Sequence, residues 1–154
     1  MIEYRHSNSQ ADVVDYVANL VNQHLAAGDR VLWLTSGGSN IMLSVQIASK
    51  LATDNSGNLY VSLVDERYGE LGHPDENWQQ LLDAGFEIKG AHPHRPLTGD
   101  SGTETASKFG QWLVEQINLA DISIGLLGIG SDGHTAGIKP HSSAVQSGET
   151  AVYY

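Results

Sequence analysis

An aspartate and a histidine two residues apart, Asp132 and His134, are the side chains best placed for acid–base chemistry in this chain. A carboxylate beside an imidazole can orient the ring and set its proton affinity, as a general base requires. Both residues lie in a glycine-rich run, LLGIGSDGHTAGIKP at 126–140. Glycine lets the backbone approach a ligand closely or adopt positive φ. The pattern predicts a catalytic loop; the alternative is a polar turn with an exposed histidine.

Two other polar segments follow apolar runs. SGGSN at 36–40 lies between a strand-like run and a helix-like one. The amides of such a turn, with the dipole of the helix that follows, can bind an anion, although a plain turn with a helix cap fits the same residues. Asp65, Glu66 and Arg67 come directly after a second apolar run. They are candidates for the same site, and a surface ion-pair cluster is the alternative.

Three glycines in the first run, Gly128, Gly130 and Gly133, match the dinucleotide-binding pattern GxGxxG. That pattern also needs a helix opening at the third glycine and a later strand ending in an acid. Pro140 would end such a helix after about two turns. We therefore reject nucleotide binding. A serine nucleophile elbow is excluded too, because Ser131 is not within GxSxG.

Histidines at 73, 92, 94 and 141 raise the question of a metal site. Their spacing matches no ligand pattern, and no pair is placed to coordinate from one helix face. We predict no metal. The sequence holds no cysteine, which excludes disulfides, thiolate catalysis and cysteine-based zinc sites.

The 154-residue sequence has a net charge of −10, with eight Lys plus Arg against eighteen Asp plus Glu. The basic residues are scattered singly, which argues against a nucleic-acid partner. No apolar run approaches the roughly 20 residues of a membrane helix, and the first residues lack the apolar core of a signal peptide. These features predict a cytoplasmic protein with neither a membrane nor a nucleic-acid partner. The basic residues are Arg5, Arg30, Lys50, Arg67, Lys89, Arg95, Lys108 and Lys139.

Apolar runs alternate with amphipathic segments along the chain. Strands are predicted at 30–35, 59–64 and 121–129, and helices at 9–26, 39–52, 77–84 and 103–118. Residues 91–100 read as a loop, and 151–154 as the start of another strand. The alternation predicts an α/β fold, a Rossmann-like, mostly parallel sheet with helices on both faces. The loops after its strands should then meet at one edge.

Helical spacing also predicts which side chains face the core. Six residues of the first helix and four of the last fall on one face each. In the first helix these are Val13, Tyr16, Val17, Leu20, Val21 and Leu25, and in the last Ala106, Phe109, Leu113 and Ile117.

Taken together and in order, SGGS at 36–39, VDER at 64–67, Asn77 and LLGIGSDGHTAGIKP at 126–140 resemble the glucosamine-6-phosphate isomerase/6-phosphogluconolactonase family. The resemblance implies that family's Rossmann-like α/β fold, with residues 1–154 as one domain. Family members are longer, so we expect a chain that lacks their C-terminal third.

The lactonase branch fits better than the isomerase branch. Lactonases carry Asp-Glu-Arg and Gly-His-Thr-Ala, as this chain does at 65–67 and 133–136. Isomerases place a glutamate where this chain has Lys139. Lactonases have a phenyl ring at that position, so Lys139 departs from both branches. The resemblance implies hydrolysis of 6-phosphogluconolactone to 6-phosphogluconate, in the pentose phosphate pathway. The alternatives are a glucosamine-6-phosphate isomerase/deaminase and a non-catalytic module that binds a sugar phosphate.

The resemblance also implies roles for individual residues. His134 is the expected general base, oriented by Asp132, and Asp65 is a second catalytic candidate. The reaction needs no metal or cofactor, and the partner is a phosphorylated sugar lactone or sugar phosphate. The residues expected to bind this substrate are Gly37, Gly38, Ser39, Arg67, Gly130 and Lys139.

Overall fold

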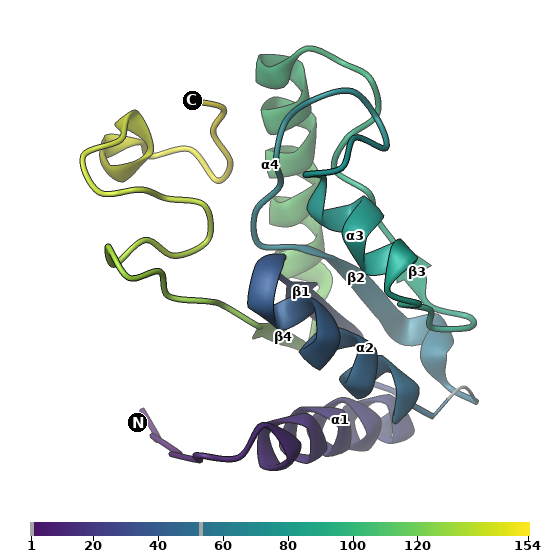
Figure 1. Cartoon of the computed structure of the whole chain (residues 1–154). Helices are drawn as coiled ribbons and strands as arrows, with labels where there is room; N and C mark the ends of the chain where they lie inside the picture. The colour runs from purple at the N-terminus through teal and green to yellow at the C-terminus, as the bar shows by residue number, and fades with distance from the viewer. Residues whose placement is uncertain (1, 53) are drawn as a thin grey trace.

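A four-stranded parallel sheet forms the centre of the computed structural model, which describes residues 2–52 and 54–154 (Figure 1). The strand order is β3-β2-β1-β4, so the first strand along the chain lies between the second and the last. All three pairings are parallel. The predicted mostly parallel α/β fold is confirmed. The strands are β1 (Val31–Thr35), β2 (Leu59–Leu63), β3 (His92–Pro93) and β4 (Ile122–Gly125).

Four α-helices connect and cover the strands, namely α1 (Gln10–Ala27), α2 (Ile41–Ser49), α3 (Asn77–Asp83) and α4 (Gly102–Leu119). Capping residues fix their ends. The side chain of Ser9 accepts the Asp12 N–H at the start of α1, and Gly28 ends that helix with a φ of 87°. Ser101 and Glu104 form a capping box at the start of α4.

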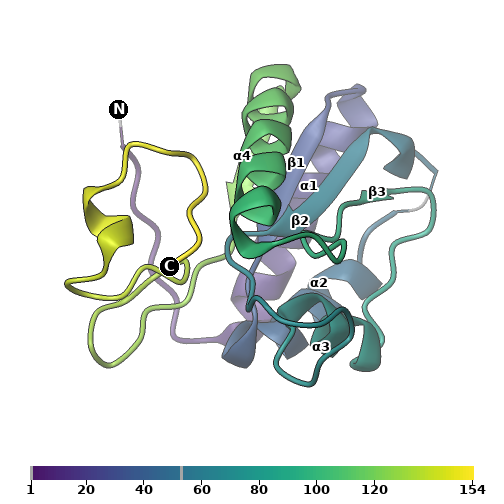
Figure 2. The same cartoon turned by 90° about the horizontal axis from the view of Figure 1, so that it is seen from above.

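The two faces of the sheet contact different helices, as Figures 1 and 2 show. Side chains alternate along a strand, so Val31 and Trp33 point to one face and Leu32 to the other. The first face packs against α1, α2 and the α3 region, where the Trp33 ring lies 5.6 Å from that of Phe86. The buried Phe109 belongs to α4, which covers the opposite face (Figure 2).

Two predicted elements differ in extent from the structure. The helix predicted at 39–52 begins with a 3₁₀ turn, η1 (Gly38–Asn40), and α2 ends at Ser49. The buried strand predicted at 121–129 is wrong in length and burial. It is only four residues long, and its side chains alternate between half-buried and exposed. The physical reason is its place in the sheet, because β4 is an outer strand.

Two side chains predicted to face the core are exposed. Tyr16 in α1 is 46% exposed and Ile117 in α4 is 48% exposed. In α1, Val14 and Ala18 are buried instead, because the helix is rotated toward its contact with α2. In α4 the buried face ends on Gln116, whose amide oxygen accepts a hydrogen bond from Arg30.

The last part of the chain leaves the sheet after β4 and lies to one side of it (Figures 1 and 2). The strand predicted at 151–154 does not form; instead both of its tyrosines make side-chain contacts. Tyr153 packs edge-on to Tyr68, with ring centroids 5.0 Å apart, and Tyr154 bonds to the segment around Gly137. The 3₁₀ turns η2 (Ser56–Asn58) and η3 (Ser143–Gln146) complete the described elements. Within residues 2–52 and 54–154, no helix combines the length and apolarity needed to cross a bilayer.

Candidate active site

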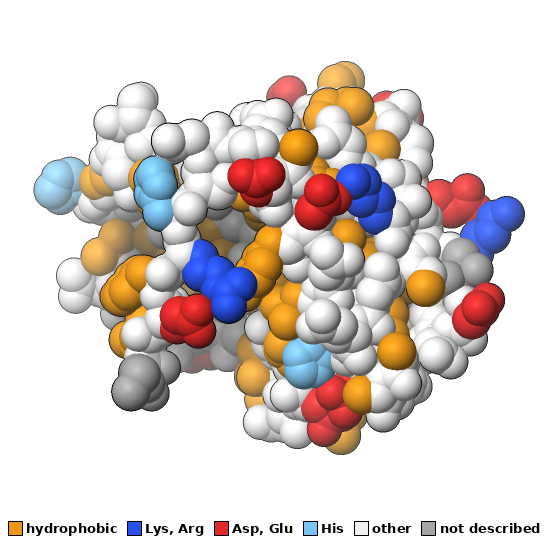
Figure 3. All heavy atoms as spheres, turned by 90° about the horizontal axis from the view of Figure 1, so that it is seen from below, with side chains coloured by type: hydrophobic (Ala, Val, Ile, Leu, Met, Phe, Trp, Pro, Cys, Tyr) orange, Lys and Arg blue, Asp and Glu red, His pale blue; other side chains and the backbone are white. Residues whose placement is uncertain are grey.

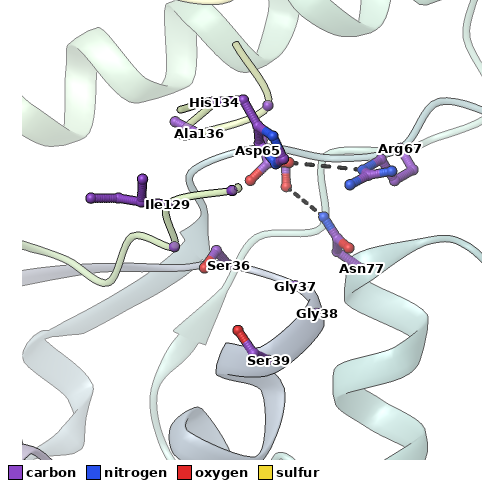
Figure 4. A pocket seen from close by; sticks show the side chains of 13 residues that line it. Ser36, Gly37, Gly38, Ser39, Asp65, Arg67, Asn77, Ile129, His134 and Ala136 are labelled. Atoms are coloured by element: carbon purple, nitrogen blue, oxygen red, sulfur yellow. Dashed lines mark hydrogen bonds and ion pairs between the residues drawn. The ribbon is translucent and has the colours of Figure 1, made fainter. Parts of the chain in front are cut away.

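A cleft of about 220 Å³ lies at the carboxyl ends of β1, β2 and β4. Each of these three strands contributes the loop that follows it, as parallel topology requires. Figure 4 shows the β1 loop below Asp65 and His134, with Arg67 and Asn77 to the side. The lining residues are Ser36, Gly37, Gly38, Ser39, Asp65, Arg67, Asn77, Gly128, Ile129, Gly130, His134, Ala136 and Gly137.

His134 and Asp132 form a direct pair at the mouth of the cleft. Nδ1 of the imidazole lies 2.5 Å from Oδ1 of Asp132, and the backbone N–H of His134 donates to the same oxygen at 3.2 Å. These hydrogen bonds hold the pKa of the Asp132 carboxyl below its usual range. An ionised carboxylate only accepts, so Nδ1 carries the proton. Nε2 is then the basic nitrogen, and among the described residues nothing bonds to it.

Gly130 supports the imidazole from the backbone. A Cβ at this position would overlap Cε1 and Nδ1 of His134, so only glycine leaves room for the ring. The amide of Gly130 donates to the carbonyl of His134 at 2.8 Å, and the amide of Gly133 donates to the carbonyl of Gly130 at 2.9 Å. The glycines of the run therefore fold a compact turn that presents one histidine.

Asp65 is the most enclosed acid of the cleft. Its side chain is 17% exposed, and Nε of Arg67 lies 3.9 Å from its Oδ2. Burial raises the pKa of the Asp65 carboxyl, while the Arg67 and His134 side chains nearby act in the opposite direction. Arg67 itself is 60% exposed, so most of its guanidinium remains available to a ligand. A half-buried carboxylate and an exposed guanidinium thus lie side by side.

Glu66, between those two residues, points away from the cleft and organises it. Its carboxylate accepts the backbone N–H groups of Arg67 and Asn77, each at 2.7 Å, and of Trp78 at 3.1 Å. The Asn77 side chain in turn donates to the carbonyl of Asp65 at 3.1 Å. Burial raises the pKa of Glu66, and the three backbone donors oppose that rise. We did not predict this role, because it depends on a loop that returns Asn77 to the end of β2.

The β1 loop contributes backbone groups rather than charge. The amides of Gly37, Gly38 and Ser39 have no acceptor among the described residues, and these residues line the cleft. A Cβ on Gly37 would overlap the Asn77 amide, so the loop lies directly against the start of α3. Free amides beside Arg67 can bind an anion such as a phosphate.

The structure brings most of the predicted site residues together. Seven of them line the cleft, namely His134, Asp65, Arg67, Gly37, Gly38, Ser39 and Gly130. Asp132 does not line it but bonds to His134, which does. Lys139 is the exception. It does not line the cleft, and its backbone N–H donates to the Tyr154 hydroxyl at 3.1 Å. Asn77, known before only from the resemblance, joins the site.

The structure also bears on two rejected interpretations. The segment with the GxGxxG pattern forms turns and two isolated bridges, with no helix opening at Gly133. Among the described residues, no group of three His, Cys, Asp or Glu side chains is close enough to hold a metal. On the face shown in Figure 3, the Lys and Arg side chains lie apart from one another and form no continuous basic patch.

Comparison with known proteins identifies the family. The sequence model of the glucosamine-6-phosphate isomerases/6-phosphogluconolactonase family matches residues 5–154. A 6-phosphogluconolactonase of Nostoc sp. is 32% identical over 126 residues, which cover 72% of this chain and 50% of that protein. The GDH/6PGL endoplasmic bifunctional protein of Oryctolagus cuniculus is 28% identical, over 95% of this chain and 19% of that protein. The chain thus spans half or less of these two relatives.

Solved structures share the fold. The crystal structure of a devB protein superposes with a TM-score of 0.77 at 24% identity, over 97% of this chain and 67% of that one. A 6-phosphogluconolactonase from Thermotoga maritima gives a TM-score of 0.65 at 20% identity, over 87% of this chain and 62% of that one. The sequence match over residues 5–154 and the shared fold agree, and the chain belongs to the glucosamine-6-phosphate isomerase/6-phosphogluconolactonase family.

Proposed function

We propose that the chain carries the hydrolytic site of a 6-phosphogluconolactonase, which converts 6-phosphogluconolactone to 6-phosphogluconate. One observation carries this proposal: among the described residues nothing bonds to Nε2 of His134, Asp132 bonds to the other ring nitrogen, and the ring lines the same cleft as the β1 loop. The 6-phosphogluconolactonase of Nostoc, 32% identical, supports the choice of substrate. The predicted cytoplasmic location and the single-domain assignment stay predictions.

The proposed reaction is general-base hydrolysis of the lactone. Nε2 of His134 removes a proton from water, and the water oxygen bonds to the lactone carbonyl carbon. The imidazolium formed is stabilised by the Asp132 carboxylate. The carbonyl oxygen becomes an oxyanion, for which backbone N–H groups of the glycine-rich loops are the donors. The bond from the carbonyl carbon to the ring oxygen then breaks, and His134 returns its proton to that oxygen.

The substrate phosphate is assigned to the other side of the cleft. The amides of Gly37, Gly38 and Ser39 line that side and can donate to an anion, and Arg67 adds a charged fork that suits phosphate oxygens. Loss of the Arg67 charge should therefore act mainly on KM. Asp65 interacts electrostatically with His134 as well as with Arg67, and a carboxylate repels a phosphate, so we assign Asp65 a role near the reacting carbon.

A direct assay tests the proposal. Hydrolysis of 6-phosphogluconolactone is measured above the spontaneous rate for wild type, His134→Ala and His6→Ala. We expect His134→Ala to lower kcat by about 10²- to 10⁴-fold, the range of general-base catalysis. His6 is exposed and outside the cleft, so His6→Ala should match wild type. Equal kcat for His134→Ala and wild type would exclude His134 as the base.

The isomerase alternative is tested with the same proteins. Its base would be Asp65, and its products from glucosamine-6-phosphate would be fructose-6-phosphate and ammonia. Ammonia release without lactone turnover would favour this alternative. A third result, thermal stabilisation by 6-phosphogluconate with neither turnover, would indicate a binding module instead.

A further inference from the structure

We propose that Tyr154 is a positioning residue for the proposed active site, because its hydroxyl closes the turn that follows His134. The hydroxyl donates to the carbonyl of Gly137 and accepts the backbone N–H of Lys139 at 3.1 Å. Two backbone groups two residues apart are thus joined by one side chain from another part of the chain. The inference rests on the proposed lactonase function.

The turn held by Tyr154 is strained. Ala136 has a φ of 49°, and Gly137 one of 70°, which puts two consecutive residues in the left-handed region. A residue with a Cβ persists there only where its surroundings fix it. The hydrogen bonds within the turn, such as the one from the Ile138 N–H to the Thr135 carbonyl, leave the Gly137 carbonyl and the Lys139 amide to Tyr154.

Packing alone does not hold this turn in place. A cavity of about 330 Å³ lies between α4 and the segment that ends at Tyr154, and Ala136 and Gly137 form part of its wall. The turn therefore has open space on one side and the cleft on the other. On the side of the cavity, two directed hydrogen bonds with Tyr154 hold the turn in addition to its contact with Asp65.

This turn also packs against Asp65 and limits where its side chain can lie. Gly137 lies so close to Asp65 that a Cβ on it would come within 2.9 Å of the Asp65 Cβ. A shift of Gly137 would thus change its contact with Asp65 and also move the backbone on which His134 lies. No hydrogen bond joins Tyr154 to the amides of Gly37 and Gly38 or to the Arg67 side chain. The clamp should therefore affect kcat more than KM.

Tyr153 and Tyr154 offer a matched pair of variants. Both are exposed tyrosines, but among the described residues nothing bonds to the Tyr153 hydroxyl. Its ring packs against Gly102 and Tyr68, and phenylalanine keeps that packing. Tyr153→Phe thus removes a free hydroxyl, and Tyr154→Phe removes one with two backbone partners.

The experiment measures kcat, KM and backbone amide exchange in both variants of the full chain. We expect Tyr154→Phe to lower kcat about five- to tenfold, as loss of one or two neutral hydrogen bonds does, with KM within about twofold. The Lys139 amide should exchange about tenfold faster. Tyr153→Phe should match wild type in all three measurements.

The outcomes separate this inference from the proposed function. Equal exchange at Lys139 in the two variants overturns the clamp, whatever the activity. Faster exchange in Tyr154→Phe with unchanged kcat shows a clamp that does not position the site, which also overturns the proposal. If wild type does not hydrolyse the lactone, the proposed function fails and the role in catalysis fails with it, while exchange still decides the clamp.

Discussion

Gly130 lies directly against the imidazole of His134, at a point where a Cβ would overlap the ring. The contact explains why one glycine of the run is needed for shape rather than for backbone conformation. Gly133, three residues later, has the opposite requirement, with a φ of 85° and open space around its Cα.

The two glycines therefore give a first prediction. Gly130→Ala should displace the imidazole and lower kcat by at least about tenfold, because a misplaced base loses most of its effect. Gly133→Ala should cost about 1–2 kcal/mol of stability, from a side chain in the left-handed region. Kinetics and urea unfolding of both variants check this. A larger loss of kcat in Gly133→Ala would contradict the assignment of the contact.

The Asp65 carboxylate should lower the stability of the fold at pH 7 while contributing to activity. Its folded-state pKa is raised, mainly by burial, so its favourable contribution is present below its ordinary pKa of about 3.8 and is lost as pH rises through the folded value. At pH 7 the ionised side chain is thus destabilising. Asp65→Asn should raise the melting temperature at pH 7, with a gain that shrinks as pH is lowered toward 4. Thermal unfolding at several pH values, together with lactone hydrolysis, measures both effects. A lower melting temperature at pH 7 would show that its contact with Arg67 outweighs burial.

Glu66 should matter for both folding and ligand binding. Glu66→Ala leaves three backbone N–H groups without their acceptor and uncaps α3, which should cost about 1–3 kcal/mol. Arg67 and Asn77 then lose their common anchor, so inhibition by inorganic phosphate should weaken. Glu70→Ala removes an exposed acid of the same loop and is the control. Equal phosphate inhibition in the two variants would limit Glu66 to a role in stability.

The ion pair between Glu76, just before α3, and Arg95 should dominate the loss of stability of this region at low pH. Glu76 is fully buried and Arg95 binds it through Nε at 2.6 Å and a second nitrogen at 2.7 Å. Although burial raises it, the pKa of Glu76 is lowered overall by bonds from Arg95 and the Gly72 amide. Its stabilisation is therefore present above about pH 4.5 and is lost as pH falls through the lower, folded value.

Arg95→Ala should cost about 3–5 kcal/mol at pH 7, because it leaves a buried carboxylate unpaired. The loss should shrink below pH 4.5. Arg5→Ala removes an exposed ion pair with Glu3 and should leave the free energy of unfolding close to that of wild type. Urea unfolding compares the two variants, and similar losses would mean that the Glu76 site is not sealed from water.

Much of the fold could be predicted from the sequence, because its signals are local. Ser9 and Gly28 bound α1 through side-chain and backbone hydrogen bonds within a few residues. The three main strands are short apolar runs with polar residues at their carboxyl ends, and parallel topology brings those ends together. That is why seven of the predicted site residues line one cleft.

The rest depended on contacts between distant residues. Asn77 reaches the cleft only because Glu66 binds the start of α3 across an eleven-residue separation. Tyr153 and Tyr154 have strand-forming side chains, yet no strand of the described residues pairs with them. The Tyr154 hydroxyl and the Tyr153 ring make other contacts instead. Lys139 sits in the predicted loop, but the turn at Ala136 and Gly137 carries it away from the cleft.

The spacing of Asp132 and His134 has a consequence for how this site would fail on heating. Two residues apart in one turn, they have a high effective concentration for each other that does not depend on the sheet. The β1 and β2 loops face them only while β1 pairs with β4. A local opening at this outer strand would separate the imidazole–carboxylate pair from the β1 and β2 loops, which stay paired with each other. Loss of lactone hydrolysis should therefore precede loss of phosphate binding on heating.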